Sequence, residues 1–318
     1  MIIRPDQYSD LDRASSPVFM RSWYLDAVYG PDRWSAILEY RTPEIFAVLP
    51  FTEYPAHCYT MPPVTQYAGP YIHLPTSLST AKRYSLQEQL LDGLLKQLDD
   101  SQIDCYAQRW GTWIENWMPA FWHRYQNEPR YTYILDCKQP YKTIYHGYSS
   151  QVRNKLKNNN IEIVEEHSID MIYQLLEHSL SLQGKKPKFT LEQITVLANA
   201  AFQNESGIAV YAKHQGRYLS GAFLLWDDGT VYYYIAGNNR DQPMYHSSTI
   251  LIDHCIKLAC QQDKRFDLTG SMLPSLSRFY RGFGASLQSY PIMTKIFTTC
   301  SELAESYNDD MRGFIFKF

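Results

Sequence analysis

The residues with the clearest chemical potential lie in two short strings near the C-terminus. In the string 266–271, Asp267 stands between two hydrophobic residues on a predicted strand, so its side chain points to the opposite face from theirs. A carboxylate there accepts a proton if it reaches a cleft, or it caps the following turn. In the second string, Tyr280 can donate a proton and Arg281 can pair with a phosphate or a carboxylate. Asp267, Tyr280 and Arg281 are therefore the candidate catalytic residues.

A polar stretch between a predicted strand and a predicted helix is a candidate anion site. Backbone N–H groups at the start of a helix bind phosphates. The stretch 237–243 contains one glycine and leads into a helix at 247–248. An ordinary strand-to-helix loop is the alternative interpretation. The candidates for binding a phosphorylated cofactor or donor are Gly237, Asn238, Asn239, Arg240, Ser247 and Ser248.

A basic helix is predicted over 149–159. Val152 and Leu156 are four residues apart and would face a core, which places Arg153 and Lys157 in a second row. That row could grip an anion, or it could simply be a solvated basic face.

The elements that must position these residues follow from hydrophobic periodicity and turn residues. In the second half the predicted order is β-α-α-β-β-β-α-β-α-β. Helices are expected from Ser168 and from Thr190, which forms a capping box with Gln193. The other helices are expected at 247–261 and 275–283. The expected strands are 161–164, 207–213, 218–226, 230–236, 265–268 and 286–294.

The first half repeats this order without its opening strand and first helix. Expected helices begin near Ser15 and at Ser85 and lie near 113–123, with strands at 34–40, 45–51, 56–61, 103–109 and 131–137. The repeat concerns element order, because residue identity between the halves is negligible. The sequence thus predicts two domains, 1–140 and 148–318, with the seam between Lys138 and Tyr148.

Composition narrows the class of protein. A chain of 318 residues with 45% hydrophobic and 20% charged residues predicts a globular α/β protein of two domains. The net charge of -3 gives no overall basic field for nucleic acid or an anionic membrane. The longest apolar runs are strand-sized, and no apolar run follows the first positive charge. We therefore expect a cytoplasmic protein that is not an integral membrane protein.

Cysteine and histidine usage argues against a metal centre. The six cysteines are scattered without a Cys-x-x-Cys pair, and the nine histidines form no cluster of ligand spacing. The cysteines are expected to be buried thiols in a reducing compartment. No metal is expected.

The element order resembles the GNAT acyltransferase fold, and two such units in tandem resemble the FemABX-like branch of that superfamily. The strings that carry the resemblance lie at 62–70, 130–136, 149–157, 266–271 and 278–285. The resemblance implies mixed sheets of α+β type in two tandem GNAT-like domains. The first domain would be degenerate, because it has no recognisable phosphate loop.

The resemblance also implies transfer of an acyl or aminoacyl group to an amine. The donor would be acyl-CoA, with its pyrophosphate at 237–243, although the usual GNAT pattern Gln/Arg-x-x-Gly-x-Gly/Ala is absent there. Asp267 would hold or deprotonate the acceptor amine, and Tyr280 would protonate the leaving thiolate. Fem peptidyltransferases often read Phe-Lys where Tyr280 stands here, which disfavours an aminoacyl-tRNA donor.

The acceptor would be a small molecule or a cell-envelope precursor that carries an amine. In tandem units the string 65–70 would lie near the interdomain cleft, a preferred place for ligands. One ring of the Tyr232-Tyr233-Tyr234 triple would line the cleft, while the others pack on the sheet. The candidate acceptor-binding residues are Gln66, Tyr67, Arg153, Tyr234 and Ser271.

Three functions remain open at this point. The first is an N-acyltransferase with a CoA-type donor. The second is a Fem-like aminoacyl-tRNA-dependent transferase, which would make tRNA the one nucleic-acid partner. The third is a non-catalytic ligand-binding protein that kept the fold, since fold alone does not fix function. A monomer or a weak homodimer is expected, because tandem units supply the pseudo-dimer of single GNAT domains.

Overall fold

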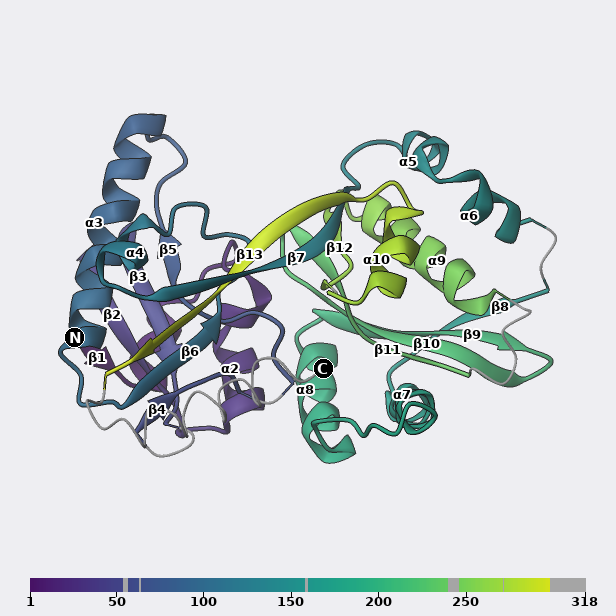
Figure 1. Ribbon diagram of the computed structural model, residues 1–318, viewed down its shortest axis with the longest axis horizontal. Coiled ribbons are helices and arrows are strands. Elements are labelled where there is room, and N and C mark those ends of the chain that lie inside the picture. Colours follow the sequence, from purple (N-terminus) through teal and green to yellow (C-terminus); the bar gives the residue numbers. More distant parts are fainter. Residues whose placement is uncertain (54–56, 63, 158–159, 240–245, 271, 298–318) are drawn as a thin grey trace. The chain divides into compact units, whose positions relative to one another are not determined.

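The computed structural model describes residues 1–53, 57–62, 64–157, 160–239, 246–270 and 272–297 (Figure 1). The chain forms two compact units, unit 1 with residues 1–130 and 289–318 and unit 2 with residues 131–288. The unit boundaries fall inside β7 (Gln126–Asp136) and β13 (Ser286–Ile296), so each of these strands contributes residues to both units. The expected domains 1–140 and 148–318 stay a prediction about the repeat, whereas these units describe the packing.

Unit 1 contains a four-stranded sheet in the order β1-β2-β3-β5 and a second set in the order β4-β6-β13. Leucines along α3 pack against both sets and form one core with Tyr106 and Trp110. The strands are β1 (Ile2–Ile3), β2 (Ser35–Thr42), β3 (Ile45–Phe51), β4 (Cys58–Tyr59), β5 (Tyr71–His73) and β6 (Cys105–Arg109). The helices are α1 (Pro5–Tyr8), α2 (Ser22–Tyr29), α3 (Thr80–Asp99) and α4 (Met118–Trp122).

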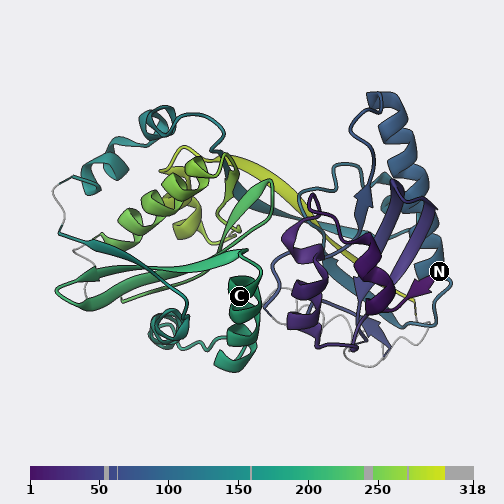
Figure 2. The ribbon, with the colours of Figure 1, turned by 180° about the vertical axis from the view of Figure 1, so that it is seen from behind.

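Unit 2 contains strands in the order β7-β12-β11-β10-β9-β8, with helices on both faces. In Figure 1, α9 and α10 lie on one face, and α7 and α8 lie on the other, as Figure 2 shows from behind. The strands are β8 (Glu162–Glu166), β9 (Gly207–His214), β10 (Arg217–Trp226), β11 (Thr230–Asn238) and β12 (Arg265–Asp267). The helices are α5 (Tyr141–Gly147), α6 (Ser150–Lys155), α7 (Asp170–Ser181), α8 (Leu191–Gln203), α9 (Ser247–Gln261) and α10 (Pro274–Arg281).

The predicted element order of the second half is confirmed. Thr190 and Gln193 form the expected capping box at the start of α8, with the Gln193 N–H donating to Thr190 Oγ1 over 3.2 Å. The spacing of hydrophobic residues and the positions of turn residues were sufficient to predict this order, because most of these strands and helices are long and have clear ends.

Three predictions in the first half are wrong. The helix expected from near Ser15 begins at Ser22, because Arg21 has an extended backbone that separates it from a 3-10 turn at Val18–Met20. Residue 56 lies outside the described residues, and 57–61 contain only the short strand β4, which pairs in parallel with β6. β5 instead pairs with β3 at the end of the antiparallel sheet. The long helix begins at Thr80 rather than Ser85, because residues 80–84 are tolerated in a helix and Ser79 is the N-cap. Ser85 Oγ instead accepts a hydrogen bond from Gln89 Nε2 at 3.1 Å.

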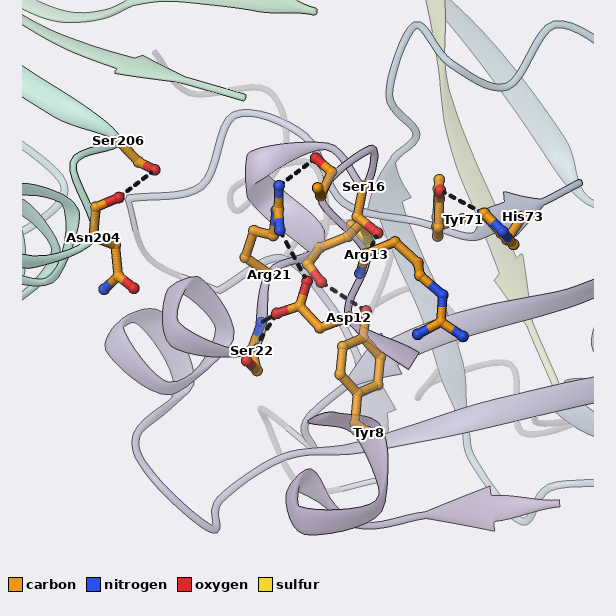
Figure 3. Close-up of polar contacts among 12 residues, drawn as sticks. Tyr8, Asp12, Arg13, Ser16, Arg21, Ser22, Tyr71, His73, Asn204 and Ser206 are labelled. Carbon is orange, nitrogen blue, oxygen red and sulfur yellow. Dashed lines mark hydrogen bonds and ion pairs between the residues drawn. The ribbon is translucent and has the colours of Figure 1, made fainter. Parts of the chain in front are cut away.

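The helix α2 is capped from a distance, which its own sequence does not reveal. Asp12 Oδ2 accepts hydrogen bonds from the Ser22 backbone N–H at 3.0 Å and from its hydroxyl at 2.9 Å (Figure 3). Arg21 Nη1 lies 3.4 Å from the other carboxylate oxygen of Asp12. A carboxylate at a helix N-terminus satisfies the free donors of the first turn and is favoured by the helix dipole.

The expectation that all the cysteines are free thiols is wrong for one pair. Cys58 and Cys105 form a disulfide that joins β4 to β6, with the two Cα atoms 4.7 Å apart. The two residues lie opposite each other in the parallel pairing of those strands, which sequence spacing could not reveal. Cys137, Cys255 and Cys260 are free.

Across the described ranges, no helix has the length and apolar character needed to cross a lipid bilayer. The same residues contain no group of three or more histidine, cysteine or acidic side chains arranged to hold a metal ion.

Candidate active site

The central feature of unit 2 is a fork between two parallel strands. β11 pairs with β12 from Thr230–Arg265 to Tyr232–Asp267, where β12 ends (Figure 1). β11 continues to Asn238 and stays paired with β10 on its other edge. Within the described residues, the edge of β11 beyond Tyr232 therefore has no register with β12. A strand edge of this kind can take an extended ligand by backbone hydrogen bonds.

Tyr234 occupies a β-bulge at this fork. β10 residues Phe223 and Leu224 pair with Ile235 and Tyr233, so Tyr234 is the extra residue in β11. A bulge bends the strand and changes the direction of its side chain, and bulges are common beside active sites. The half-buried Tyr234 ring lies 6.2 Å from the Phe223 ring. Tyr234, a predicted acceptor-binding residue, thus lies at the fork. Its role in binding stays a prediction.

Asp267 closes the end of β12. Its side chain is fully buried, and Oδ1 accepts hydrogen bonds from the Thr269 N–H at 2.7 Å and from the Thr132 hydroxyl. Thr269 has a left-handed backbone with φ of 51°, and its hydroxyl donates to the Tyr233 carbonyl at 2.6 Å. The Asp267 carboxylate therefore caps the turn, which was one of the two roles expected for it. The same turn, through Thr269, supplies a donor to the carbonyl of Tyr233, the first β11 residue beyond the register with β12.

Tyr280 on α10 lies next to this turn. Its side chain is only 8% exposed, and its ring centroid is 6.1 Å from that of Tyr133. Burial, and secondarily the negative charge of Asp267, raises the pKa of Tyr280 to about 12. The phenol is therefore protonated at neutral pH, which is the state that a proton donor requires. The sequence analysis did not predict the contacts of Thr132 and Tyr133, because only the fold brings β7 beside β12. It also did not single out Thr269, which lies two residues after Asp267.

Arg281 is separated from Tyr280 by the helix geometry. Successive residues of a helix point about 100° apart, so the buried Tyr280 and the exposed Arg281 leave α10 in different directions. Asp267 and Tyr280 are brought together, whereas Arg281 faces solvent.

The N-terminus of α9 follows the fork. His246 is the N-cap residue with φ of 51°, and its side chain makes no capping hydrogen bond. The Ser248 hydroxyl donates to Asn238 Oδ1 at the end of β11, and Ser247 is the first helical residue. The described contacts of the first turn leave the Ser247 and Ser248 N–H groups without a backbone acceptor. Such groups, together with the helix dipole, fit an anion.

The other residues of the predicted anion site have different surroundings. The Asn239 N–H donates to the Leu219 carbonyl at 2.7 Å. A Cβ on Gly237 would lie 2.5 Å from the Leu176 nitrogen, so the close packing of α7 on β11 requires glycine there. Arg240 lies outside the described residues, as does Ser271 of the predicted acceptor site.

The predicted basic row on the helix after the seam does not form. α6 ends at Lys155, so Arg153 and Lys157 do not share a helix face. Arg153 Nη1 donates to the carbonyls of His146 and Tyr148, the first at 3.2 Å, and so ties α6 to the end of α5.

Gln66 and Tyr67 belong to unit 1. Tyr67 is fully buried, with ring centroids of Phe19 at 5.4 Å and Tyr290 at 5.1 Å. Gln66 is half-buried and its Nε2 lies 3.4 Å from the Tyr290 hydroxyl, while Arg109 Nη1 donates to its Oε1 at 3.5 Å. Tyr67 is thus a core residue of unit 1 in this structure, and a role for either residue in acceptor binding stays a prediction.

A parallel fork followed by a helix is the arrangement that the resemblance to GNAT-type acyltransferases implied for unit 2. Residues 151–274 match the family model described as an acetyltransferase (GNAT) domain. The match contains the fork, the start of α9 and the turn at Asp267. The expectation of a GNAT-type acyltransferase is therefore confirmed.

The whole chain has the tandem fold of FemX-like proteins. It is similar to FemX with 11% identity and a TM-score of 0.67, covering 99% of both chains. It is also similar to the C-terminal domain of a putative lysylphosphatidylglycerol synthetase from Agrobacterium fabrum, with 10% identity, a TM-score of 0.54 and coverage of 97% and 95%. The L-PGS structure from Bacillus licheniformis gives 10% identity, a TM-score of 0.50 and coverage of 91% of both chains. No curated protein matches the sequence.

Proposed function

We propose that unit 2 transfers an acyl group from a CoA-type thioester to an amine acceptor. The observation that carries the proposal is the fork, where the described part of β11 has no register with β12 beyond Tyr232 and α9 begins at Ser247. The amide-bearing arm of the donor would add to the edge of β11 as an extended strand does. Its pyrophosphate would lie at the N–H groups of Ser247 and Ser248.

The chemistry of this transfer assigns a step to Tyr280. The acceptor nitrogen attacks the thioester carbonyl, a C–N bond forms, the C–S bond breaks and the sulfur leaves as a thiolate. Tyr280 donates its proton to that thiolate, while the proton lost by the nitrogen passes to water. The Tyr280 phenolate then recovers a proton from water, which restores the phenol for the next turnover.

Asp267 and Arg281 act differently in this proposal. Because Asp267 is buried and holds two threonines, it serves as a positioning residue that fixes the turn beside Tyr280. The exposed Arg281 would meet a phosphate or carboxylate of a substrate. Tyr234 at the bulge would contact the acceptor or the acyl group.

The direct test is thiol release from acetyl-CoA in the presence of a panel of amines, including amino sugars, amino acids and short peptides. Acceptor-dependent release of free CoA supports the proposal. If none of the acceptors gives release and CoA does not bind, the CoA-type donor is wrong.

An aminoacyl-tRNA donor is the second candidate, favoured by the exposed Lys185, Lys186 and Lys188 in the loop between α7 and α8. A cluster of lysines is the group that contacts a phosphate backbone. This candidate would be favoured over the first if tRNA binds with an affinity that falls steeply as the salt concentration rises, and if CoA does not bind.

A further inference from the structure

A cavity in unit 2 is lined by none of the residues of the fork. It has a volume of about 250 Å³ and is lined by side chains from α5, the end of α6, β8 and α9. The residues that line it are Tyr141, Tyr145, Leu156, Ile163, Ile250, Asp253, His254 and Lys257. None of the residues assigned to acyl transfer is among them. Its size lies just below the usual range of small-molecule sites, which suits a ligand of a few carbon atoms.

One side of α9 supplies the polar groups of this cavity. Ile250, Asp253, His254 and Lys257 recur at helical spacing and therefore form one stripe along the helix. Ile252, Ile256 and other core residues of α9 pack on the sheet instead. The stripe that faces the cavity thus carries charge where the core stripe is apolar.

The buried carboxylate in the cavity is already satisfied. Asp253 is 4% exposed, and its Oδ1 accepts hydrogen bonds from the Tyr141 hydroxyl at 2.6 Å and the Tyr148 hydroxyl at 3.1 Å. Its Oδ2 lies 2.7 Å from Lys257 Nζ. With three donors in place, Asp253 has little capacity for a cationic ligand and serves instead to orient its partners.

Lys257 and His254 retain capacity for a ligand. The Lys257 side chain is 46% exposed, and its ammonium group, which has three protons, lies 5.0 Å from the Tyr141 ring centroid. His254 Nε2 lies 3.2 Å from Glu165 Oε1, which leaves the other ring nitrogen available. The remaining titratable group that lines the cavity is Tyr145. A second wall is apolar and consists of Leu156, Ile163 and Ile250.

We propose that this cavity binds a small monocarboxylate with a short apolar chain. The carboxylate would accept a charge-assisted hydrogen bond from Lys257 Nζ, and a second one from His254 Nδ1 when the imidazole carries both protons. The chain would pack against Leu156, Ile163 and Ile250. The site is independent of acyl transfer at the fork.

The test is calorimetric titration of the full chain with three probes of matched length, hexanoate, hexanamide and hexylamine. Hexanoate should bind at least about ten-fold more tightly than hexanamide, because a hydrogen bond to a charged group contributes more than one to a neutral group. Excess CoA should leave hexanoate binding unchanged, which separates this cavity from the proposed donor site. Displacement by CoA would place hexanoate at the fork and overturn the proposal.

Variants locate the interaction. Lys257→Gln should remove the preference for hexanoate over hexanamide, whereas Lys264→Gln, a lysine beside Trp226, should retain it. Leu156→Phe should fill the cavity and weaken both probes alike while Lys257 remains in place. Each variant is compared with the wild type by thermal melting, so that loss of fold is recognised.

Other outcomes overturn the proposal. Tighter binding of hexylamine that persists in Lys257→Gln would show that the cavity recognises a cation. Equal binding of all three probes would show an unselective apolar site. The absence of saturable binding by any probe would show that the cavity is not a ligand site.

Discussion

Unit 1 and unit 2 share an order of elements but use the space between their central strands differently. In unit 2, β11 leaves β12 after three residue pairs and presents an open edge. In unit 1, the corresponding region contains Tyr67, Trp110 and Trp113, and a Cβ on Gly69 would lie 2.4 Å from the Trp110 ring. The same architecture therefore separates two parallel strands in one unit and packs aromatic rings in the corresponding region of the other.

The strand that precedes the long helix also differs between the units. β11 has nine residues with a bulge at Tyr234, whereas β5 has three residues and pairs with β3. Unit 1 adds a disulfide between β4 and β6. Unit 1 is thus stabilised by packing and a covalent link, whereas unit 2 contains the residues that we propose for acyl transfer.

The largest expected effect concerns the covalent link in unit 1. The double change Cys58→Ser with Cys105→Ser should lower the free energy of unfolding by about 4 kcal/mol, because the bridge closes a loop of 47 residues. Denaturant unfolding measures this, with Cys255→Ser as the control for a buried free thiol. Unchanged stability of the double variant under oxidising conditions would show that the bridge does not hold unit 1 together.

The next effect concerns catalysis in unit 2. Tyr280→Phe should lower kcat by about a hundred-fold or more without unfolding the protein, because it removes only the proton donor. Tyr218→Phe, which loses a hydroxyl that bonds Glu166 elsewhere in unit 2, should have near wild-type turnover. Equal turnover of Tyr280→Phe and the wild type would remove Tyr280 from the mechanism.

The pKa of Tyr280 also predicts how stability depends on pH. In the unfolded chain the phenol ionises near pH 10, whereas in the folded protein its pKa is about 12. The unfolded state therefore binds fewer protons between these values, and stability falls as pH rises from 10 to 12. Tyr280→Phe should show a shallower decline in chemical-denaturation free energy over that window. Parallel curves for the two proteins would contradict the raised pKa.

A smaller effect concerns how α7 packs on β11. Gly237→Ala should cost about 1–3 kcal/mol, because the new methyl group meets the backbone of Leu176 and Ile172. Gly229→Ala is the matched control, since the nearest atom to its Cβ would be 3.7 Å away. Thermal melting compares the two, and equal melting temperatures would show that α7 shifts without cost.

The smallest effect concerns the start of α9. Ser248→Ala removes the hydrogen bond to Asn238 and should weaken CoA binding by about five- to ten-fold, the effect of roughly one hydrogen bond. Calorimetric titration with CoA measures the change, and Ser206→Ala, outside the fork, serves as the control. If Ser248→Ala binds CoA as the wild type does, the orientation of this loop does not depend on the bond.

The sequence predicted the elements of unit 2 because they are long and periodic, as α9 at Ser247–Gln261 illustrates. Asp267 and Tyr280 were each chosen as candidates from local strings, and their proximity was not predicted. The partners of Asp267 were beyond prediction, because Thr132 is 135 residues away along the chain. β5 was missed because a strand of three residues is too short to show alternation of hydrophobic and polar residues. Tyr67 was predicted at a ligand site because it stands among polar turn residues, although its ring is buried in the core.

The measurement that tests the central comparison most directly is the stoichiometry of CoA binding to the full chain by titration calorimetry. One open fork and one closed counterpart predict a single site per chain, weakened by Ser248→Ala. Two equivalent sites would show that unit 1 also binds the donor, and the absence of binding would show that the fork of unit 2 does not bind a CoA-type donor.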